Sequence, residues 1–373
     1  MSEKGHSLSC LGLYTLMTAP YALKAFIGPF LDSNFLQKLP LGPRRFIALC
    51  AQAGLISLFL LSALTMAHPK PFWTFLTAFL ISTVGAIQDL SLEAYRIEST
   101  PSQAVGVSVW ASTVGFRIGF LLAGGGGLYM AEMLSWPHTY LILAGALLVG
   151  PLCVLLVGPE KKTTKERFRP SWTKAYRHLN KRLAFTTIFT TLVTVKCCDS
   201  ILSAFSGPFF IHLGYTKLHI AETVKVWGFL AMLGGHSLYG WLLMRYPIRS
   251  VLASTACLQL VSITLFLILG SHETSTPLLL ACSLAQHIGA AAVMTTLIAI
   301  MTYAAKAPYT AAQSGLMASF SSLTRIGCTM GAGYASSVFG WTHFLWLLLG
   351  IQTAFATILI IRAVLPRPVF KRP

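Results

Sequence analysis

The sequence predicts an all-α polytopic membrane protein with about eleven transmembrane helices. Hydrophobic residues make up 55% of the 373 residues and charged residues only 10%, whereas soluble domains contain about 25% charged residues. The mean hydropathy is +0.68. The apolar residues also gather in runs of roughly 20 residues, the length that crosses a bilayer as a helix. The lipid bilayer is therefore the first expected partner of this chain.

Each predicted helix is an apolar run that ends where charged, proline or glycine residues begin. The first run is no signal peptide, because it is too long, contains Pro20 and Lys24, and lacks a cleavage site of small residues. The expected limits of the eleven spans are 8–31, 46–67, 72–93, 103–130, 139–157, 183–211, 220–244, 251–269, 277–301, 310–334 and 341–361.

Basic residues alternate between the loops that join these spans. They follow the odd-numbered spans, most densely in 158–182, and they are sparse after spans two, four, eight and ten. Lysine and arginine are enriched in cytoplasmic loops, so the C-terminus is expected in the cytoplasm and the N-terminus outside. This topology also accounts for the net charge of +17, and no nucleic-acid partner is expected.

Short matches indicate an internal repeat. Arg117-Ile118-Gly119 in span four recurs as Arg325-Ile326-Gly327 in span ten, and Trp136-Pro137-His138 is echoed by Trp341-Thr342-His343. Span four thus maps onto span ten, which makes the repeat unit six helices. The predicted organisation is a five-span N-terminal half (1–157), a basic cytoplasmic linker (158–182) and a six-span C-terminal half (183–373). Two such halves are typical of secondary transporters, and a first helix is missing by this count.

Motifs for enzymatic chemistry are absent from the sequence. The glycine run 124–127 lacks the lysine and serine or threonine of a nucleotide-binding loop, and close helix packing is its favoured interpretation. The eight cysteines have no C-x-x-C spacing and predict neither a zinc site nor a disulfide framework. The vicinal pair Cys197-Cys198 could be redox-active, although small free core residues are the favoured interpretation. We expect no enzyme activity, no metal and no cofactor.

Two acids close the third apolar run. Asp89 and Glu93 stand at positions i and i+4 of one predicted helix, and an ionised side chain costs roughly 2.5–3.5 kcal/mol at a membrane helix centre. We therefore expect proton coupling from Asp89 first, with Glu93 and Asp199 as further candidates. The alternative for Glu93 is an interfacial position, where it would pair with Arg96.

Cations also fall inside predicted spans. Lys24, Arg117, Lys196 and Arg325, together with Gln88 beside Asp89, are the expected substrate-binding residues. Arg117 and Arg325 occupy equivalent positions in the repeat, so each half would present a guanidinium to a central cavity. Guanidinium groups bind carboxylates bidentately, which favours an anionic small-molecule substrate. An internal ion pair between Lys196 and Asp199 is the alternative. His236, His287, Gln286 and Gln352 could also line the cavity, although satisfied contacts between helices are the favoured interpretation for each.

The order of several motifs resembles the AmpG muropeptide permease family of the major facilitator superfamily, over about residues 5–361. The matching segments are Pro20-Tyr21-Ala22-Leu23-Lys24, Pro29-Phe30-Leu31-Asp32, Gly42-Pro43-Arg44-Arg45, the stretch 88–96, Gly115-Phe116-Arg117-Ile118-Gly119, Lys196-Cys197-Cys198-Asp199, Pro208-Phe209 with Leu213-Gly214-Tyr215, and Tyr309-Thr310-Ala311-Ala312-Gln313. Glu93, Ser33 and Met244 depart from the pattern, where the family has Asp, Arg and Asp.

The resemblance implies a major facilitator fold and a proton-coupled importer of anhydromuropeptides, which are cell-wall recycling fragments, in the bacterial inner membrane. It also implies that Asp32, Arg44 and Arg45 form a cytoplasmic gate, for which positive-inside anchoring is the alternative. The protein is expected to act as a monomer. Two other functions stay open: transport of another small anionic metabolite on the same fold, and a truncated remnant that does not transport.

Overall fold

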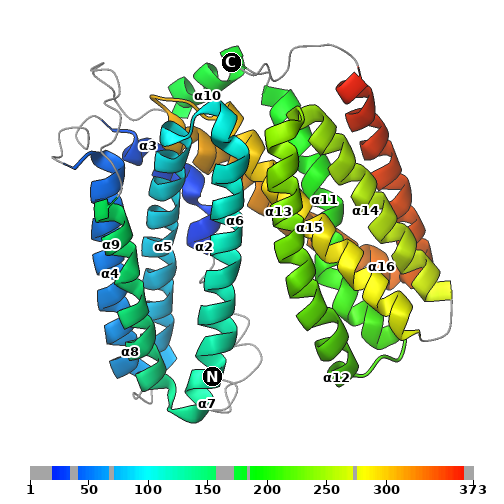
Figure 1. Cartoon of the computed structure of the whole chain (residues 1–373), viewed down its shortest axis with the longest axis horizontal. Coiled ribbons are helices and arrows are strands. Elements are labelled where there is room, and N and C mark those ends of the chain that lie inside the picture. Colours follow the sequence, from blue (N-terminus) through cyan, green and yellow to red (C-terminus); the bar gives the residue numbers. More distant parts are fainter. Residues whose placement is uncertain are drawn as a thin grey trace. The chain divides into compact units, whose positions relative to one another are not determined.

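The computed structural model describes residues 19–33, 41–66, 71–156, 172–182, 185–271 and 275–364. These residues are helical or form short turns and contain no strand (Figure 1). The all-α fold class is therefore confirmed. The first part of span one, most of the basic linker and the C-terminal tail lie outside the described residues.

The described helices follow the apolar runs in order. The helices are α2 (Ala19–Ala22), α3 (Lys24–Leu31), α4 (Pro43–Met66), α5 (Pro71–Ser99), α6 (Val105–Leu121), α7 (Gly127–Met133), α8 (Trp136–Leu147), α9 (Val149–Leu156), α10 (Trp172–Arg182), α11 (Phe185–His212), α12 (Lys217–Ile220), α13 (Trp227–Arg245), α14 (Ile248–Ser271), α15 (Thr276–Ala304) and α16 (Thr310–Val364). Two π-helical segments interrupt this series, Leu122–Gly126 before α7 and Ala221–Val226 before α13.

Within the described residues, eight helical segments are long and apolar enough to cross a membrane. They correspond to the expected spans two to six, eight, nine and eleven. The residues expected in spans seven and ten are helical as well, in α13 with the π-helical segment before it and in the first part of α16. The expected total of eleven spans stays a prediction.

A single residue divides the longest helix. Gly340 has φ 71° and ψ 168° inside α16, a conformation that side chains with a Cβ rarely adopt. The break falls between the predicted spans ten and eleven. The two spans are therefore joined through one glycine, with helix on both sides of it.

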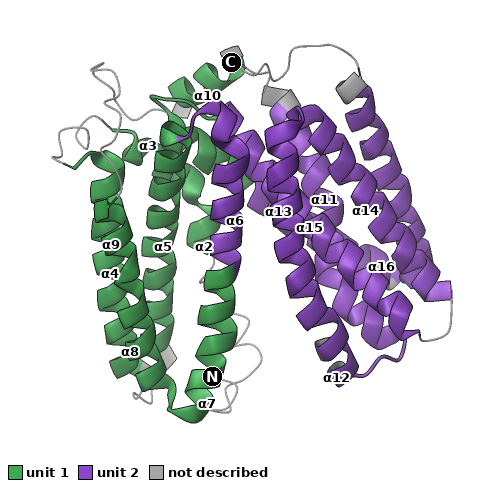
Figure 2. Cartoon of the chain, viewed as in Figure 1, with its two compact units in different colours: residues 1–99, 118–182, 305–320 green, residues 100–117, 183–304, 321–373 purple. Residues whose placement is uncertain are grey.

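The described residues cluster into two compact units (Figure 2). Unit 1 takes its residues from 1–99, 118–182 and 305–320, and unit 2 takes them from 100–117, 183–304 and 321–373. In unit 1, α4 packs against α5 and α8, and Leu31, Leu90, Ala94 and Ala311 form a small buried cluster. The division into halves at 158–182 stays a prediction.

The larger apolar core lies in unit 2. There α15 packs against α13, α14 and α11, and the rings of Phe209, Phe210 and Phe266 contact one another inside the core cluster. Lipid tails are as apolar as these side chains, so close packing, and not removal from water, stabilises this core. This core holds α11 and α15 in fixed positions beside the cavity described below.

The glycine run does not serve the close packing that the sequence suggested. Residues 122–126 form a π-helical turn, and a Cβ added to Gly124 would meet nothing within 4 Å. The interpretation of this run as a tight helix contact was therefore wrong. Its glycines accompany a local change of helix type instead.

Candidate functional site

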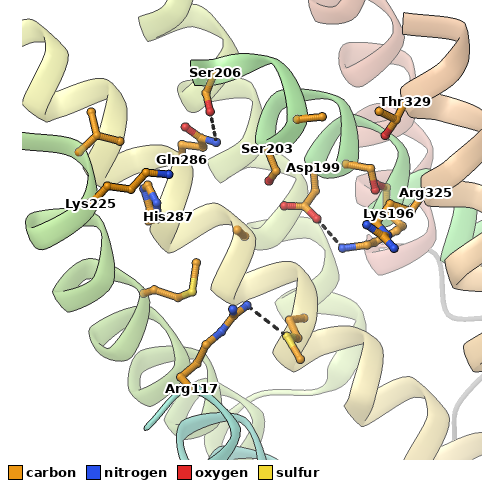
Figure 3. Close-up of a pocket in the computed structure, with 16 residues that line it drawn as sticks. Arg117, Lys196, Asp199, Ser203, Ser206, Lys225, Gln286, His287, Arg325 and Thr329 are labelled. Carbon is orange, nitrogen blue, oxygen red and sulfur yellow. Dashed lines mark hydrogen bonds and ion pairs between the residues drawn. The ribbon is translucent and has the colours of Figure 1, made fainter. Parts of the chain in front are cut away.

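A cavity of about 420 Å³ lies within unit 2 (Figure 3). Its walls come from α6, α11, α13, α15 and α16 and from the π-helical segment Ala221–Val226. The charged and polar residues that line it are Arg117, Lys196, Asp199, Ser200, Ser203, Ser206, Lys225, Gln286, His287, Arg325 and Thr329. Four cations thus face the cavity and only one carboxylate, so the cavity favours anions.

The polar wall on α11 follows from helical spacing. The residues Lys196, Asp199, Ser200, Ser203 and Ser206 all line the cavity. Steps of three and four residues place side chains on one face of an α-helix. The opposite side of α11 packs into the core through residues such as Cys198 and Ile201. One helix therefore supplies both a polar face toward the cavity and an apolar face toward the core.

Arg117 reaches the cavity from α6, which approaches α13 closely. A Cβ on Gly106 would lie 2.5 Å from the carbonyl oxygen of Gly240, so glycine permits this helix crossing. The indole Nε1 of Trp110 donates to Ser237 Oγ at 3.1 Å across the same contact. The crossing attaches the N-terminal part of α6 to α13, and Arg117 lies further along the same helix.

The guanidinium of Arg117 forms no direct ion pair among the described residues, and Asp199 interacts with it only at longer range. Its Nη2 donates to Met294 Sδ at 3.5 Å, and its buried Nε has no hydrogen-bond partner. A thioether is a weak acceptor, and an unsatisfied buried donor costs about 1–3 kcal/mol. An anionic ligand in the cavity would supply the missing acceptor.

Arg325 and Lys225 also line the cavity with exposed side chains. Figure 3 shows Arg325 beside Lys196, Arg117 on a separate wall and Lys225 near His287. Lys225 was missed by the sequence analysis because it lies near the predicted start of span seven. It belongs to a π-helical segment, and such segments often occur at functional sites.

Lys196 and Asp199 form an ion pair, with Nζ and Oδ2 2.6 Å apart. The pair matches the alternative interpretation of these residues, and both members still line the cavity. Asp199 has only 7% of its side chain exposed. Because Lys196 largely neutralises Asp199, the excess positive charge of the cavity comes from Arg117, Lys225 and Arg325.

Gln286 and His287 supply hydrogen-bonding atoms to the cavity wall. Gln286 Nε2 donates to the Leu202 carbonyl at 3.3 Å and to Ser206 Oγ at 3.2 Å, which fixes the orientation of the amide because a carbonyl can only accept. Gln286 Oε1 is buried without a partner among the described residues. The expectation of a satisfied contact therefore holds for only half of this side chain. His287 Nδ1 donates to the Ser283 carbonyl at 2.8 Å.

The remaining polar residues expected to make satisfied contacts lie between helices of unit 2. His236 Nδ1 and Thr295 Oγ1 are 2.8 Å apart, and Gln352 Nε2 donates to the Ala256 carbonyl at 3.1 Å. His236 Nε2 and Gln352 Oε1 have no hydrogen-bond partner among the described residues. Each side chain is therefore only half satisfied.

A second charged cluster lies in unit 1. Lys24 on α3 is buried and forms an ion pair with Asp89 on α5, whose side chain is 57% exposed. Glu93, one turn further, interacts electrostatically with Lys24, Asp89 and Arg96, and Gln88 is half-buried beside the pair. The structure thus brings two of the three expected proton carriers, Asp89 and Glu93, together with Lys24 in unit 1, whereas the third, Asp199, lines the unit 2 cavity.

The residues expected to form a gate divide into two groups. Asp32 Oδ1 accepts from Arg44 Nη2 at 2.5 Å, and the same nitrogen donates to Glu98 Oε1 at 2.8 Å. Asp32 also accepts from the backbone N–H groups of Ala311 and Ala312, which begin α16. This carboxylate therefore caps the N-terminus of α16, a contact that the sequence analysis did not predict.

Arg45 does not contact Asp32 through any described hydrogen bond or ion pair. Its guanidinium donates instead to the carbonyl oxygens of Val154 and Leu155 at the end of α9. Cations at helix C-termini are favourable because the last carbonyls lack partners within the helix. The structure thus places Arg45 at a helix end and apart from the Asp32–Arg44–Glu98 cluster.

Comparisons with known proteins place this architecture in a family. The model of the Major Facilitator Superfamily matches residues 1–271. A curated relative from Rickettsia conorii, named "Putative transporter AmpG 4", is 28% identical, and the match covers 92% of this chain and 86% of the relative. "Putative transporter AmpG 3" from Rickettsia prowazekii is 27% identical, with 92% and 85% covered.

Solved structures show the same fold at low sequence identity. The human organic anion transporter MFSD10 has a TM-score of 0.68 at 17% identity, covering 96% of this chain and 87% of that chain. The fucose:proton symporter FucP of E. coli has a TM-score of 0.65 at 14% identity, covering 94% of each chain. The chain therefore belongs to the major facilitator superfamily, whose members are multi-pass membrane transporters of small molecules.

Proposed function

We propose that this protein is a proton-coupled secondary transporter that imports anhydromuropeptides through the bacterial inner membrane. The observation that carries the proposal is the unit 2 cavity, in which Arg117 offers a buried guanidinium donor that forms no direct ion pair among the described residues. Lys225 and Arg325 line the same cavity. A carboxylate of the substrate would satisfy these donors.

The substrate class combines cavity chemistry with family resemblance. Muropeptides carry lactyl and peptide carboxylates for the cations, and their amide N–H groups could donate to Gln286 Oε1, which lacks a partner among the described residues. The AmpG names of the curated relatives and the motifs quoted above favour muropeptides over other small anions. The basic loop pattern supports a cytoplasmic C-terminus.

Uptake of labelled anhydromuropeptide tests the substrate directly. Vesicles that contain the protein are expected to accumulate the label when a proton gradient is imposed, and a protonophore is expected to abolish the accumulation. Vesicles without the protein provide the background. Accumulation of another anionic metabolite, with no muropeptide signal, would assign the cavity to a different substrate, and no accumulation of either would favour a non-transporting protein.

Asp89 is the residue through which we expect coupling to protons. A proton on Asp89 would neutralise its carboxylate and break its ion pair with Lys24. The buried ammonium group of Lys24 would then lack its counter-ion. Asp89→Asn mimics the protonated form permanently. It is expected to reduce accumulation to the equilibrium level while substrate binding and exchange are retained.

Glu132→Gln is the matched control for this variant, because Glu132 is exposed on α7 and belongs to none of the described ion pairs. It is expected to accumulate substrate as the unmodified protein does. Full gradient-driven accumulation by Asp89→Asn would move the coupling role to Asp199, the carboxylate in the cavity.

A further inference from the structure

We propose that Cys197 and Cys328 form a redox-responsive dithiol site, which a hydroperoxide converts into a disulfide between α11 and α16. The two Sγ atoms lie 3.1 Å apart, on helices that are far apart in the sequence. A disulfide requires an S–S separation of about 2.05 Å, so the sulfurs need to approach by about 1 Å. Both cysteines are free and only partly buried.

Cys198 is a poorer disulfide partner for Cys197 than Cys328, although the two neighbouring thiols are also in contact. Adjacent residues on an α-helix do not face each other, and α11 is helical throughout Phe185–His212. Cys198 is 1% exposed and belongs to the apolar core of unit 2. The cross-helix pair is therefore the redox candidate, and Cys198 is a buried core residue, which was the interpretation that the sequence favoured.

The reaction balances with a hydroperoxide as the oxidant. The sulfur of one thiol attacks the peroxide, the O–O bond breaks, and the alcohol leaves with the proton of that thiol. The resulting sulfenic acid is then attacked by the second sulfur, and water leaves with the second proton. The two thiols are oxidised to one disulfide, and the hydroperoxide is reduced to an alcohol and water.

The site has a consequence for the cavity because both cysteines stand between cavity-lining residues. Cys197 lies between Lys196 and Asp199 on α11, and Cys328 lies between Arg325 and Thr329 on α16. A disulfide would hold the two Cα atoms within about 4.4–6.8 Å. The disulfide would thus fix the spacing of Lys196 and Arg325. Transport would stop, because α11 and α16 could no longer separate to load or release an anion.

Peptide mapping tests the chemistry without reference to transport. Membranes with the full chain are treated with tert-butyl hydroperoxide, free thiols are blocked with N-ethylmaleimide, and the digest is analysed by mass spectrometry before and after dithiothreitol. A linked peptide joining Cys197 to Cys328 is expected. It should disappear in Cys328→Ser and persist in Cys198→Ala. A Cys197–Cys198 link, or no link, would overturn the proposal.

The effect on the cavity rests on the proposed function and is measured separately. Oxidation is expected to lower the uptake of the unmodified protein to background, and dithiothreitol is expected to restore it. The variant with both Cys197→Ala and Cys328→Ala should be insensitive to the oxidant. A linked peptide with unchanged uptake would refute the locking of the cavity. If no variant transports at all, the proposed function fails and the peptide map still decides the dithiol site.

Discussion

Replacing Arg117 with alanine is expected to weaken binding of the transported anion roughly ten- to a hundredfold. A hydrogen bond to a charged group contributes about 1.5–3 kcal/mol, and about 1.4 kcal/mol corresponds to a factor of ten in affinity. Arg117 is the cavity cation whose buried Nε has no hydrogen-bond partner among the described residues. The concentration dependence of uptake, at matched expression, measures the change.

Two further variants show whether the effect belongs to the cavity. Arg117→Lys keeps the charge but loses the planar, bidentate donor group, so its affinity should fall between those of the unmodified protein and Arg117→Ala. Arg245→Ala removes an exposed cation at the end of α13, away from the residues that line the cavity. Equal losses in Arg245→Ala and Arg117→Ala would show that general surface charge, and not the cavity, attracts the anion.

Arg44→Met is expected to destabilise the protein by about 3–5 kcal/mol, the cost of removing one partner from a buried ion pair. Arg44 is 4% exposed and Asp32 is 3% exposed. Without Arg44, the carboxylate of Asp32 would remain buried with only the backbone donors at the start of α16. Thermal unfolding in detergent micelles, followed by circular dichroism, measures the difference.

Glu98→Gln supplies the comparison within the same cluster. The Glu98 side chain is 21% exposed, and Arg44 keeps its ion pair with Asp32 in this variant. The loss of stability should therefore be clearly smaller than in Arg44→Met. If the two variants unfold at the same temperature, the buried Asp32–Arg44 pair is not the stabilising part of the cluster.

The sequence predicted the fold class because membrane helices are specified locally, by the length and polarity of each apolar run. It also predicted that Arg117 and Arg325 belong to one cavity, since both occupy equivalent repeat positions. The structure does bring both residues to the lining of the unit 2 cavity. Their role in binding an anion remains a prediction.

Other features could not be predicted because they depend on tertiary contacts or on departures from regular helix. Nothing in the local sequence shows that Lys24 pairs with Asp89, which lies 65 residues later. Lys225 was overlooked because it lies near the start of predicted span seven, in a segment that the structure shows to be π-helical. The family resemblance grouped Arg45 with Arg44 in one gate, although the two guanidinium groups bind different partners.

The cap that Asp32 places on α16 has a consequence for the order of folding during synthesis. Asp32 and Arg44 are close in sequence and can pair as soon as α4 has been made. The backbone N–H of Ala312, which Asp32 also binds, follows 280 residues later. Contacts of such large sequence separation form late because the chain between them must first be ordered. A nascent chain that stops before α16 can therefore pair Asp32 with Arg44, but it lacks the backbone N–H groups of Ala311 and Ala312 that Asp32 binds in the complete fold.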